Sequence, residues 1–150
     1  MSVSMPHAHI SLITLGVADV PRAARFYEAL GFRRKMKAAP ENEVAFFDAG
    51  TLALSLYAVS GLASDAGFAP DTAPSPFRGA SLAWNCSSET EVDAVMELAL
   101  QAGAKELVPA KKAAWGGYHG HFADPDGHIW EVAYNPQFPL TADGRPTLPD

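Results

Sequence analysis

The sequence is poor in cysteine and in positive charge, and each shortage excludes a class of protein. Cys86 is the only cysteine, so the chain can form no internal disulfide and no CxxC metal or redox motif, which fits a reducing compartment. The 11 basic residues stand against 17 acidic ones, and the longest basic run is Arg33-Arg34-Lys35. At a net charge of −6, neither nucleic acid nor an anionic membrane is an expected partner.

Long apolar segments are also missing. No run of 18 apolar residues occurs, and the N-terminal stretch MSVSMPHAHISL has no basic region followed by an apolar one. These features predict a cytoplasmic protein.

The length and composition suit a single domain. The chain has 150 residues, of which 48% are hydrophobic, and this suits a single well-buried globular domain over residues 1–150.

The first half of the chain reads as a strand, a helix and three further strands. The β-branched run HISLITLGV predicts a strand over 9–17. Asp19 is a good helix N-cap, Pro21 suits a first turn, and an apolar stripe at three- and four-residue spacing predicts a helix over 20–30, ended by Gly31. Three strand-like runs follow: FRRKMKAA (32–39), EVAFFDAG (43–50) and TLALSLYAV (51–59).

The second half repeats this plan after a segment rich in proline and glycine. Ser88 and Glu91 form a capping-box signature for a helix that Gly103 closes. The strand-like runs around it are GASLAWNC (79–86), AKELVPA (104–110), GYHGHFA (117–123) and HIWEVAY (128–134). The pattern βαβββ therefore occurs twice, at a period of roughly 70 to 77 residues, as in an internal duplication. We assign module one to about 8–59, a linker to 60–78, module two to 79–135 and an irregular tail to 136–150.

Two segments of this internally repeated chain resemble motifs of the vicinal oxygen chelate superfamily, and they occur in the same order as in that family. The superfamily includes glyoxalase I, bleomycin-resistance proteins and extradiol dioxygenases. They are LITLGVADVPRAARFYEALGF, similar to the family's opening strand and helix, and FADPDGHIWEV, similar to its closing hairpin. The likeness covers about residues 8–135. It implies an α+β fold in which two βαβββ modules form a curled eight-stranded mixed sheet around a cup.

In metal-dependent members, the resemblance implies four cup-facing ligand positions, one in the first strand and one in the last strand of each module. Glu131 falls on the fourth of these. The other three positions hold Leu12, Ser81 and either Leu54 or Ser55. A leucine methyl group cannot ligate a metal, and one carboxylate cannot form a tight site. We therefore expect no metal cofactor at the usual positions.

The histidines of the closing hairpin leave several roles open for Glu131. His119 and His121 lie on one face of their strand, because side chains alternate with period two. A type I turn with a glycine bulge at Asp124–Gly127 would place His121 opposite Glu131. The pair could tie the hairpin together, recognise a ligand, or act as catalytic acid and base. With His119, it could also form a nonstandard site for a divalent transition metal.

Further candidate ligand-binding residues are Trp115, Tyr118, Ser55 and Trp84. Trp115 precedes two glycines and could cover the mouth of the cup, or it could anchor a core or a dimer interface. Trp84 stands in a predicted strand, where an aromatic residue is commonly part of the core. Cys86 lacks a nearby base in the sequence, so we do not expect it to act as a nucleophile.

Together these observations predict a homodimer that binds a small organic molecule in its cup without the usual metal. Such a protein could sequester its ligand, as bleomycin-resistance-like members do, or act as a metal-independent enzyme. The alternative is a metal-dependent lyase or dioxygenase, like glyoxalase I or the extradiol enzymes, that uses Glu131 with nonstandard histidine ligands.

Overall fold

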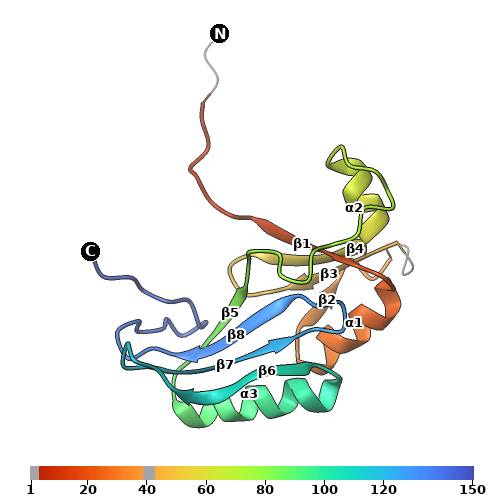
Figure 1. Ribbon diagram of the computed structural model, residues 1–150. Helices are drawn as coiled ribbons and strands as arrows, with labels where there is room; N and C mark the ends of the chain where they lie inside the picture. Colours follow the sequence, from red (N-terminus) through yellow and green to blue (C-terminus); the bar gives the residue numbers. More distant parts are fainter. Residues whose placement is uncertain (1–3, 39–42) are drawn as a thin grey trace.

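The computed structural model describes residues 4–38 and 43–150, and it contains the two predicted βαβββ modules (Figure 1). Residue 39, the last of the first predicted run after the helix, lies outside the described residues. Module one consists of β1 (Leu12–Val17), α1 (Val20–Ala29), β2 (Arg33–Lys35), β3 (Val44–Asp48) and β4 (Ala53–Ala58). Module two consists of β5 (Leu82–Cys86), α3 (Glu89–Ala102), β6 (Lys105–Lys112), β7 (Tyr118–Ala123) and β8 (Ile129–Tyr134). The α+β class and the internal repeat are confirmed.

Both long helices begin and end where their capping residues predict. The Asp19 side chain accepts a hydrogen bond of 3.1 Å from the amide of Arg22, and Ser88 Oγ accepts one of 3.1 Å from the amide of Glu91. The Glu91 carboxylate in turn accepts hydrogen bonds from the amide and the hydroxyl of Ser87, which lower the pKa of Glu91. Gly103 ends α3 in the left-handed conformation, at φ 111°.

The linker contains a helix that the sequence pattern does not predict. This helix, α2, spans Val59–Asp65 and packs against the first sheet beside Gly16. A side chain at Gly16 would approach Val59 Cγ2 at 3.1 Å and Leu62 Cδ2 at 3.3 Å, so glycine makes room for the helix. Seven residues are too few to show a helical period, and Gly61 within them lowers helix propensity.

The strands form two four-stranded sheets that are not closed into one. Their orders are β1-β4-β3-β2 and β5-β8-β7-β6, and in each sheet the first pair is parallel while the other two pairs are antiparallel. The registers of the two sheets also match. Thr14 pairs with Ser55 in the first sheet, and Ala83 pairs with Glu131 in the second. Thr14 and Ala83 each lie five residues before the cap of the following helix, so Ser55 is the counterpart of Glu131.

A single hydrophobic core joins the helix-bearing faces of the two sheets. The ring centroid of Tyr27, on α1, lies 6.3 Å from that of Phe47 on β3 and 6.0 Å from that of Trp130 on β8. Phe26 packs edge-on against Phe122 of β7, and α3 lies along the same face of the second sheet (Figure 1). Because successive side chains of a strand alternate, the opposite face of each sheet turns away from this shared core. We call these two the open faces.

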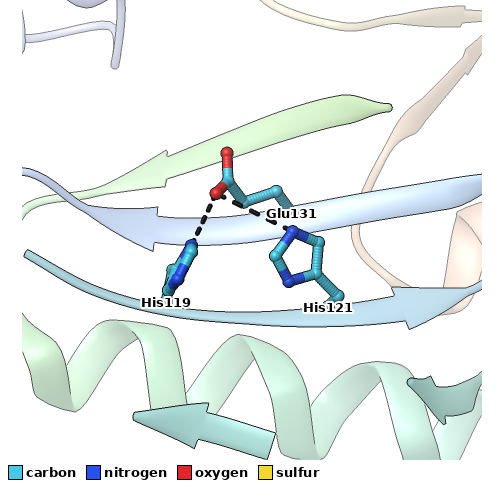
Figure 2. Close-up of side chains that lie close together, drawn as sticks. All are labelled: His119, His121 and Glu131. Carbon is cyan, nitrogen blue, oxygen red and sulfur yellow. Dashed lines mark hydrogen bonds and ion pairs between the residues drawn. The ribbon is translucent and has the colours of Figure 1, made fainter. Parts of the chain in front are cut away.

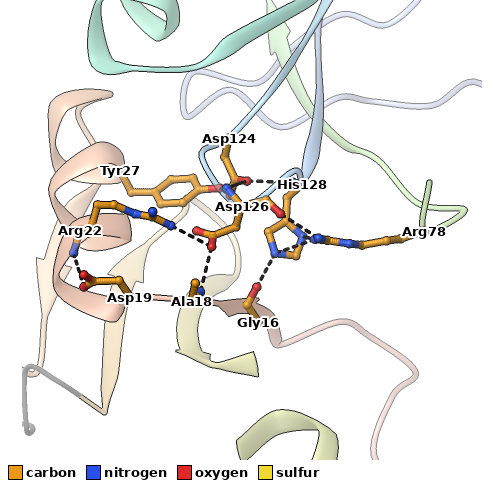
Figure 3. Close-up of polar contacts among 9 residues, drawn as sticks. All are labelled: Gly16, Ala18, Asp19, Arg22, Tyr27, Arg78, Asp124, Asp126 and His128. Atoms are coloured by element: carbon orange, nitrogen blue, oxygen red, sulfur yellow. Dashed lines mark hydrogen bonds and ion pairs between the residues drawn. The ribbon is translucent and has the colours of Figure 1, made fainter. Parts of the chain in front are cut away.

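Polar contacts at the turn between β7 and β8 hold the modules together (Figure 3). Asp126 Oδ1 accepts hydrogen bonds from the amide of Ala18 at 2.8 Å and from Arg22 Nη2 at 3.0 Å. His128 Nε2 lies 2.7 Å from the carbonyl oxygen of Gly16, while Arg78 Nη1 lies 2.7 Å from His128 Nδ1. Since a carbonyl oxygen only accepts hydrogen bonds, the contact with Gly16 requires a proton on Nε2 of His128. The turn thus fixes where the hairpin ends relative to module one.

The C-terminal segment is mostly irregular and contains one isolated bridge between Leu140 and Pro146. Of the helices in residues 4–38 and 43–150, none combines the length and apolarity needed to cross a membrane.

Candidate functional site

Three polar side chains meet on the open face of the second sheet (Figure 2). Glu131 on β8 lies beside His119 and His121, which are two residues apart on β7. The distance from Glu131 Oε2 to His119 Nδ1 is 2.6 Å, and to His121 Nε2 it is 3.8 Å. The two imidazole centroids lie 5.2 Å apart. We refer to these three residues as the His-Glu cluster.

The backbone register explains why the cluster forms. Gly127 adopts a left-handed conformation at φ 87°, its amide donates to the carbonyl of Asp124, and the amide of Asp124 donates to the carbonyl of His128. Counting outward from this turn places His121 opposite Glu131, as the sequence predicts. The short hydrogen bond, however, is made by His119, the diagonal neighbour of Glu131. Diagonal pairs lie within reach of long side chains in a twisted antiparallel sheet.

An irregularity in the neighbouring strand lies next to the cluster. On β6, Val108 pairs with His121 and Lys111 pairs with His119, so two residues of β6 face the single residue Gly120. A side chain at Gly120 would approach the amide nitrogen of Ala110 at 3.0 Å. Bulges of this kind are frequent beside functional sites, where they redirect side chains. Here the bulge spans the stretch of β7 that carries both histidines.

Trp115 borders the cluster. Its ring packs edge-on against His119, with centroids 5.1 Å apart, and the residue remains 44% exposed. A side chain at Gly117 would overlap the Trp115 ring, so this glycine leaves the space that the indole occupies. The side chains of His119, His121 and Glu131 are 22%, 27% and 28% exposed, so a small molecule can reach them from solvent.

The cluster can both accept and donate protons. An imidazole can donate a proton from one ring nitrogen and accept one at the other, and a carboxylate held within hydrogen-bond distance can exchange a proton with it. The same atoms can bind a hydroxylated or cationic ligand, or ligate a metal ion.

Ser55 lies on the open face of the first sheet, where it is 3% exposed and its Oγ accepts a hydrogen bond of 3.3 Å from Thr14 Oγ1. The strand register identifies Ser55, rather than Leu54, as the counterpart of Glu131. The four positions implied by the family resemblance therefore hold Leu12, Ser55, Ser81 and Glu131. One methyl-bearing side chain, two hydroxyls and one carboxylate do not fit a divalent transition metal.

Two other candidates from the sequence lie away from the cluster. Tyr118 points toward α3, where its hydroxyl donates a hydrogen bond of 2.6 Å to Asp93 Oδ1. Trp84 lies on the core side of the second sheet, with its ring 5.5 Å from that of Phe32. The structure therefore does not bring Tyr118 or Trp84 into contact with Glu131.

Trp84 instead lines a cavity of about 680 Å³ between the two modules. Apolar side chains form most of its wall, including Ile13, Leu54 and Trp130, and residues 143–146 of the C-terminal segment lie along it. The His-Glu cluster is not among the residues that line this cavity. The reactive groups lie on the open face, outside this cavity, and chemistry depends on those groups. Sequence reasoning missed the cavity because distant segments form it and no local pattern marks it.

Cys86 is buried at the end of β5, beside the core. Burial raises the pKa of its thiol to about 11, with a smaller contribution from the nearby Glu91 carboxylate. The thiol is therefore protonated near neutral pH and is a poor nucleophile, in agreement with the sequence analysis.

Comparisons with known proteins agree with this architecture. The family described as "Glyoxalase/Bleomycin resistance protein/Dioxygenase superfamily" matches residues 8–132. A glyoxalase-related enzyme from Fulvimarina pelagi is 38% identical, with a TM-score of 0.83 over 95% of this chain and 99% of that one. No curated protein matches this chain.

More distant solved structures share the fold. Lactoylglutathione lyase from Agrobacterium tumefaciens is 20% identical, with a TM-score of 0.64 over 87% of this chain and 96% of that one. The genomically encoded fosfomycin resistance protein FosX from Listeria monocytogenes is also 20% identical, with a TM-score of 0.64 over 87% of this chain and 95% of that one.

Proposed function

Because this chain belongs to the glyoxalase/bleomycin resistance protein/dioxygenase superfamily, we propose that it binds a small organic molecule on the open face of its second sheet. The observation that carries this proposal is the His-Glu cluster, in which three polar side chains converge at a partly exposed position beside Trp115. Polar side chains that converge next to an aromatic ring are typical of small-molecule sites.

Each part of the cluster has a role in this proposal. Glu131 accepts hydrogen bonds from the ligand, or takes a proton from it, and His121 donates to it. His119 holds the Glu131 carboxylate in place through the hydrogen bond of 2.6 Å. Trp115 covers one side of the bound molecule, since its ring already packs against His119.

We further propose that a second copy of the chain completes the site. The shared core turns the two open faces away from each other, so Ser55 of one chain cannot face Glu131 of the same chain across a cup. In a homodimer, the open face of the first sheet of one copy would lie over the His-Glu cluster of the other. Two exposed apolar residues support burial against a partner: Leu12, the first residue of β1, and Ile10, which precedes the strand.

The usual metal of the family is not part of this proposal. Leu12, Ser55 and Ser81 offer no imidazole and no carboxylate to accompany Glu131 at the usual positions, so ligand recognition there relies on hydrogen bonds and apolar contact. Of the relatives named above, one is a lyase and one a fosfomycin resistance protein. Catalysis thus has precedent on this fold.

Sequestration is the first candidate, and a metal-independent enzyme is the second. The observation that favours the second is the short contact between an imidazole and a carboxylate, which suits proton transfer to or from a bound substrate. We place the protein in the cytoplasm, since its lone cysteine is buried and forms no disulfide bond.

A ligand panel tests the proposal. Thermal unfolding of the wild type is measured with a set of small hydroxylated, carboxylated and amine-bearing compounds, beside Glu131→Gln and the surface control Glu97→Gln. We expect a binding compound to raise the Tm of the wild type and of the control by several degrees, and to leave Glu131→Gln unchanged. Equal stabilisation of Glu131→Gln would mean that the molecule binds elsewhere.

A further inference from the structure

We infer that His119, His121 and Glu131 form a binding site for a divalent transition-metal ion of the zinc class, which shares only Glu131 with the metal positions implied by the family. The inference rests on the proposed function only in that both use the same open face. Its basis is the spacing, chemistry and accessibility of three donor atoms.

The donors already lie close to the spacing that such an ion requires. One ligand atom from each of the three residues lies within 4.8 Å of the other two. Zinc bound tetrahedrally to nitrogen at about 2.0–2.1 Å keeps neighbouring donors about 3.3 Å apart. The 3.8 Å between Glu131 Oε2 and His121 Nε2 is close to this value, and the 2.6 Å contact with His119 must open slightly. Relative to the spacing of about 3.3 Å, each of these two changes is smaller than about 1 Å.

The backbone supports this arrangement. A histidine, one intervening residue and a second histidine on a strand place both imidazoles on one face, and the neighbouring strand supplies the carboxylate. Hydrogen bonds of the β7–β8 ladder fix the relative positions of the three Cα atoms. A ligand set carried by rigid strands loses little conformational entropy when the ion binds.

The donor types select the class of ion. Two imidazoles and one carboxylate suit zinc and its first-row neighbours, whereas calcium and magnesium prefer sites built from oxygen donors alone. Three protein ligands also leave at least one coordination position open. The open position would face solvent and the proposed organic ligand, because each of the three side chains is partly exposed.

Most groups that border the cluster are apolar, and Lys111 of β6, which pairs with His119, is the cationic one among the strand partners. The Trp115 indole packs against His119, and Val108 lies opposite His121 on β6. Ala83 lies beside Glu131 on β5. Such apolar neighbours lower the local dielectric constant, which strengthens the attraction between the carboxylate and a cation.

The test is a cobalt titration of protein that carries no affinity tag and has been freed of metal with a chelator. Cobalt(II) reports its own geometry through visible absorption, and intense bands indicate coordination by four or five ligands. We expect one cobalt ion per chain, displaced by one equivalent of zinc. His119→Ala and Glu131→Gln should each weaken binding by more than the 10- to 100-fold loss that follows removal of an outer-shell partner.

A matched control is available in the same chain. His7 and His9 also form a His-x-His pair, in the exposed N-terminal segment. The double variant His7→Ala/His9→Ala should bind cobalt like the wild type. Loss of binding in that variant, unchanged binding in Glu131→Gln, or no binding by the wild type at micromolar concentrations would overturn the inference. Circular dichroism of each variant shows that a loss is not caused by unfolding.

This experiment is separable from the test of the proposed function. The ligand panel is run in the presence of a chelator as well as with added zinc. A compound that binds through Glu131 under chelator, in a protein that takes up no cobalt, would support the proposed function and contradict the metal site. If the protein takes up one cobalt ion per chain but no compound binds at Glu131, the metal site would be supported and the proposed function contradicted.

Discussion

The hydroxyl of Tyr27 donates a hydrogen bond of 2.6 Å to Oδ2 of Asp124, and this buried contact joins helix α1 of module one to the β7–β8 turn of module two. Asp124 Oδ1 accepts from the amides of Asp126 and His128, so one carboxylate both shapes the turn and binds the other module. This β7–β8 turn also sets the strand register that brings His121 opposite Glu131. Stability and site geometry therefore depend on the same residue.

Tyr27→Phe should destabilise the protein by about 1.5–3 kcal/mol, because it removes a buried hydrogen bond to a charged group. Asp124→Asn keeps one oxygen that can accept from the amides of Asp126 and His128, but it replaces the oxygen that accepts from the Tyr27 hydroxyl. Urea unfolding of both single variants and the double variant measures the coupling. Strict additivity of the two effects would show that the contact contributes nothing of its own.

Cys86 should react slowly with thiol reagents. Because burial raises its pKa to about 11, little thiolate is present at pH 8 and the sulfur is shielded. The rate of reaction with a disulfide reagent should be far below that of the urea-unfolded protein, and it should rise steeply only above pH 10. A native rate equal to the unfolded rate at pH 8 would contradict this account.

The stabilising effect of Glu91 should disappear in acid. Hydrogen bonds from Ser87 lower the pKa of this carboxylate in the folded protein, so its contribution is present above the unfolded pKa, about 4.3, and is lost as the pH falls through the folded value. The difference in unfolding free energy between the wild type and Glu91→Gln should therefore shrink from pH 7 to pH 3. A difference that grows toward low pH would have the wrong sign.

Gly117→Ala should displace Trp115 from His119. The new methyl group would overlap the indole and would lie 2.6 Å from the carbonyl oxygen of Tyr134. We expect a red shift of tryptophan emission as the indole becomes more exposed. The same substitution in a Trp115→Phe background serves as the control and should leave the emission of Trp84 and Trp130 unchanged. A shift of equal size in that background would assign the change to the core instead.

Much of the fold could be predicted from the sequence because capping residues and strand alternation are local signals. Asp19 and Ser88 mark the starts of two helices, and both are where the structure has them. The helix α2 gives no such signal, because it is a single short segment without a capping side chain.

The site could be predicted only in part. The turn sequence was enough to place His121 opposite Glu131, since register follows from turn geometry. The choice of His119 as the hydrogen-bond partner depends on sheet twist, which a sequence does not display. The position of Trp84 in a cavity between the modules depends on how two separate sheets pack, and no residue pattern encodes that arrangement locally.

The most direct test of the central claim, that the open face around Glu131 is the binding site, is NMR mapping of bound fragments on isotope-labelled protein. A library of small polar and aromatic compounds is titrated, and the backbone amide shifts are followed. The account predicts that the largest shifts fall in residues 118–123 and 129–134 and vanish in Glu131→Gln. Shifts confined to the residues around Trp84 and to 143–146, retained in that variant, would place the binding site in the cavity and contradict the account.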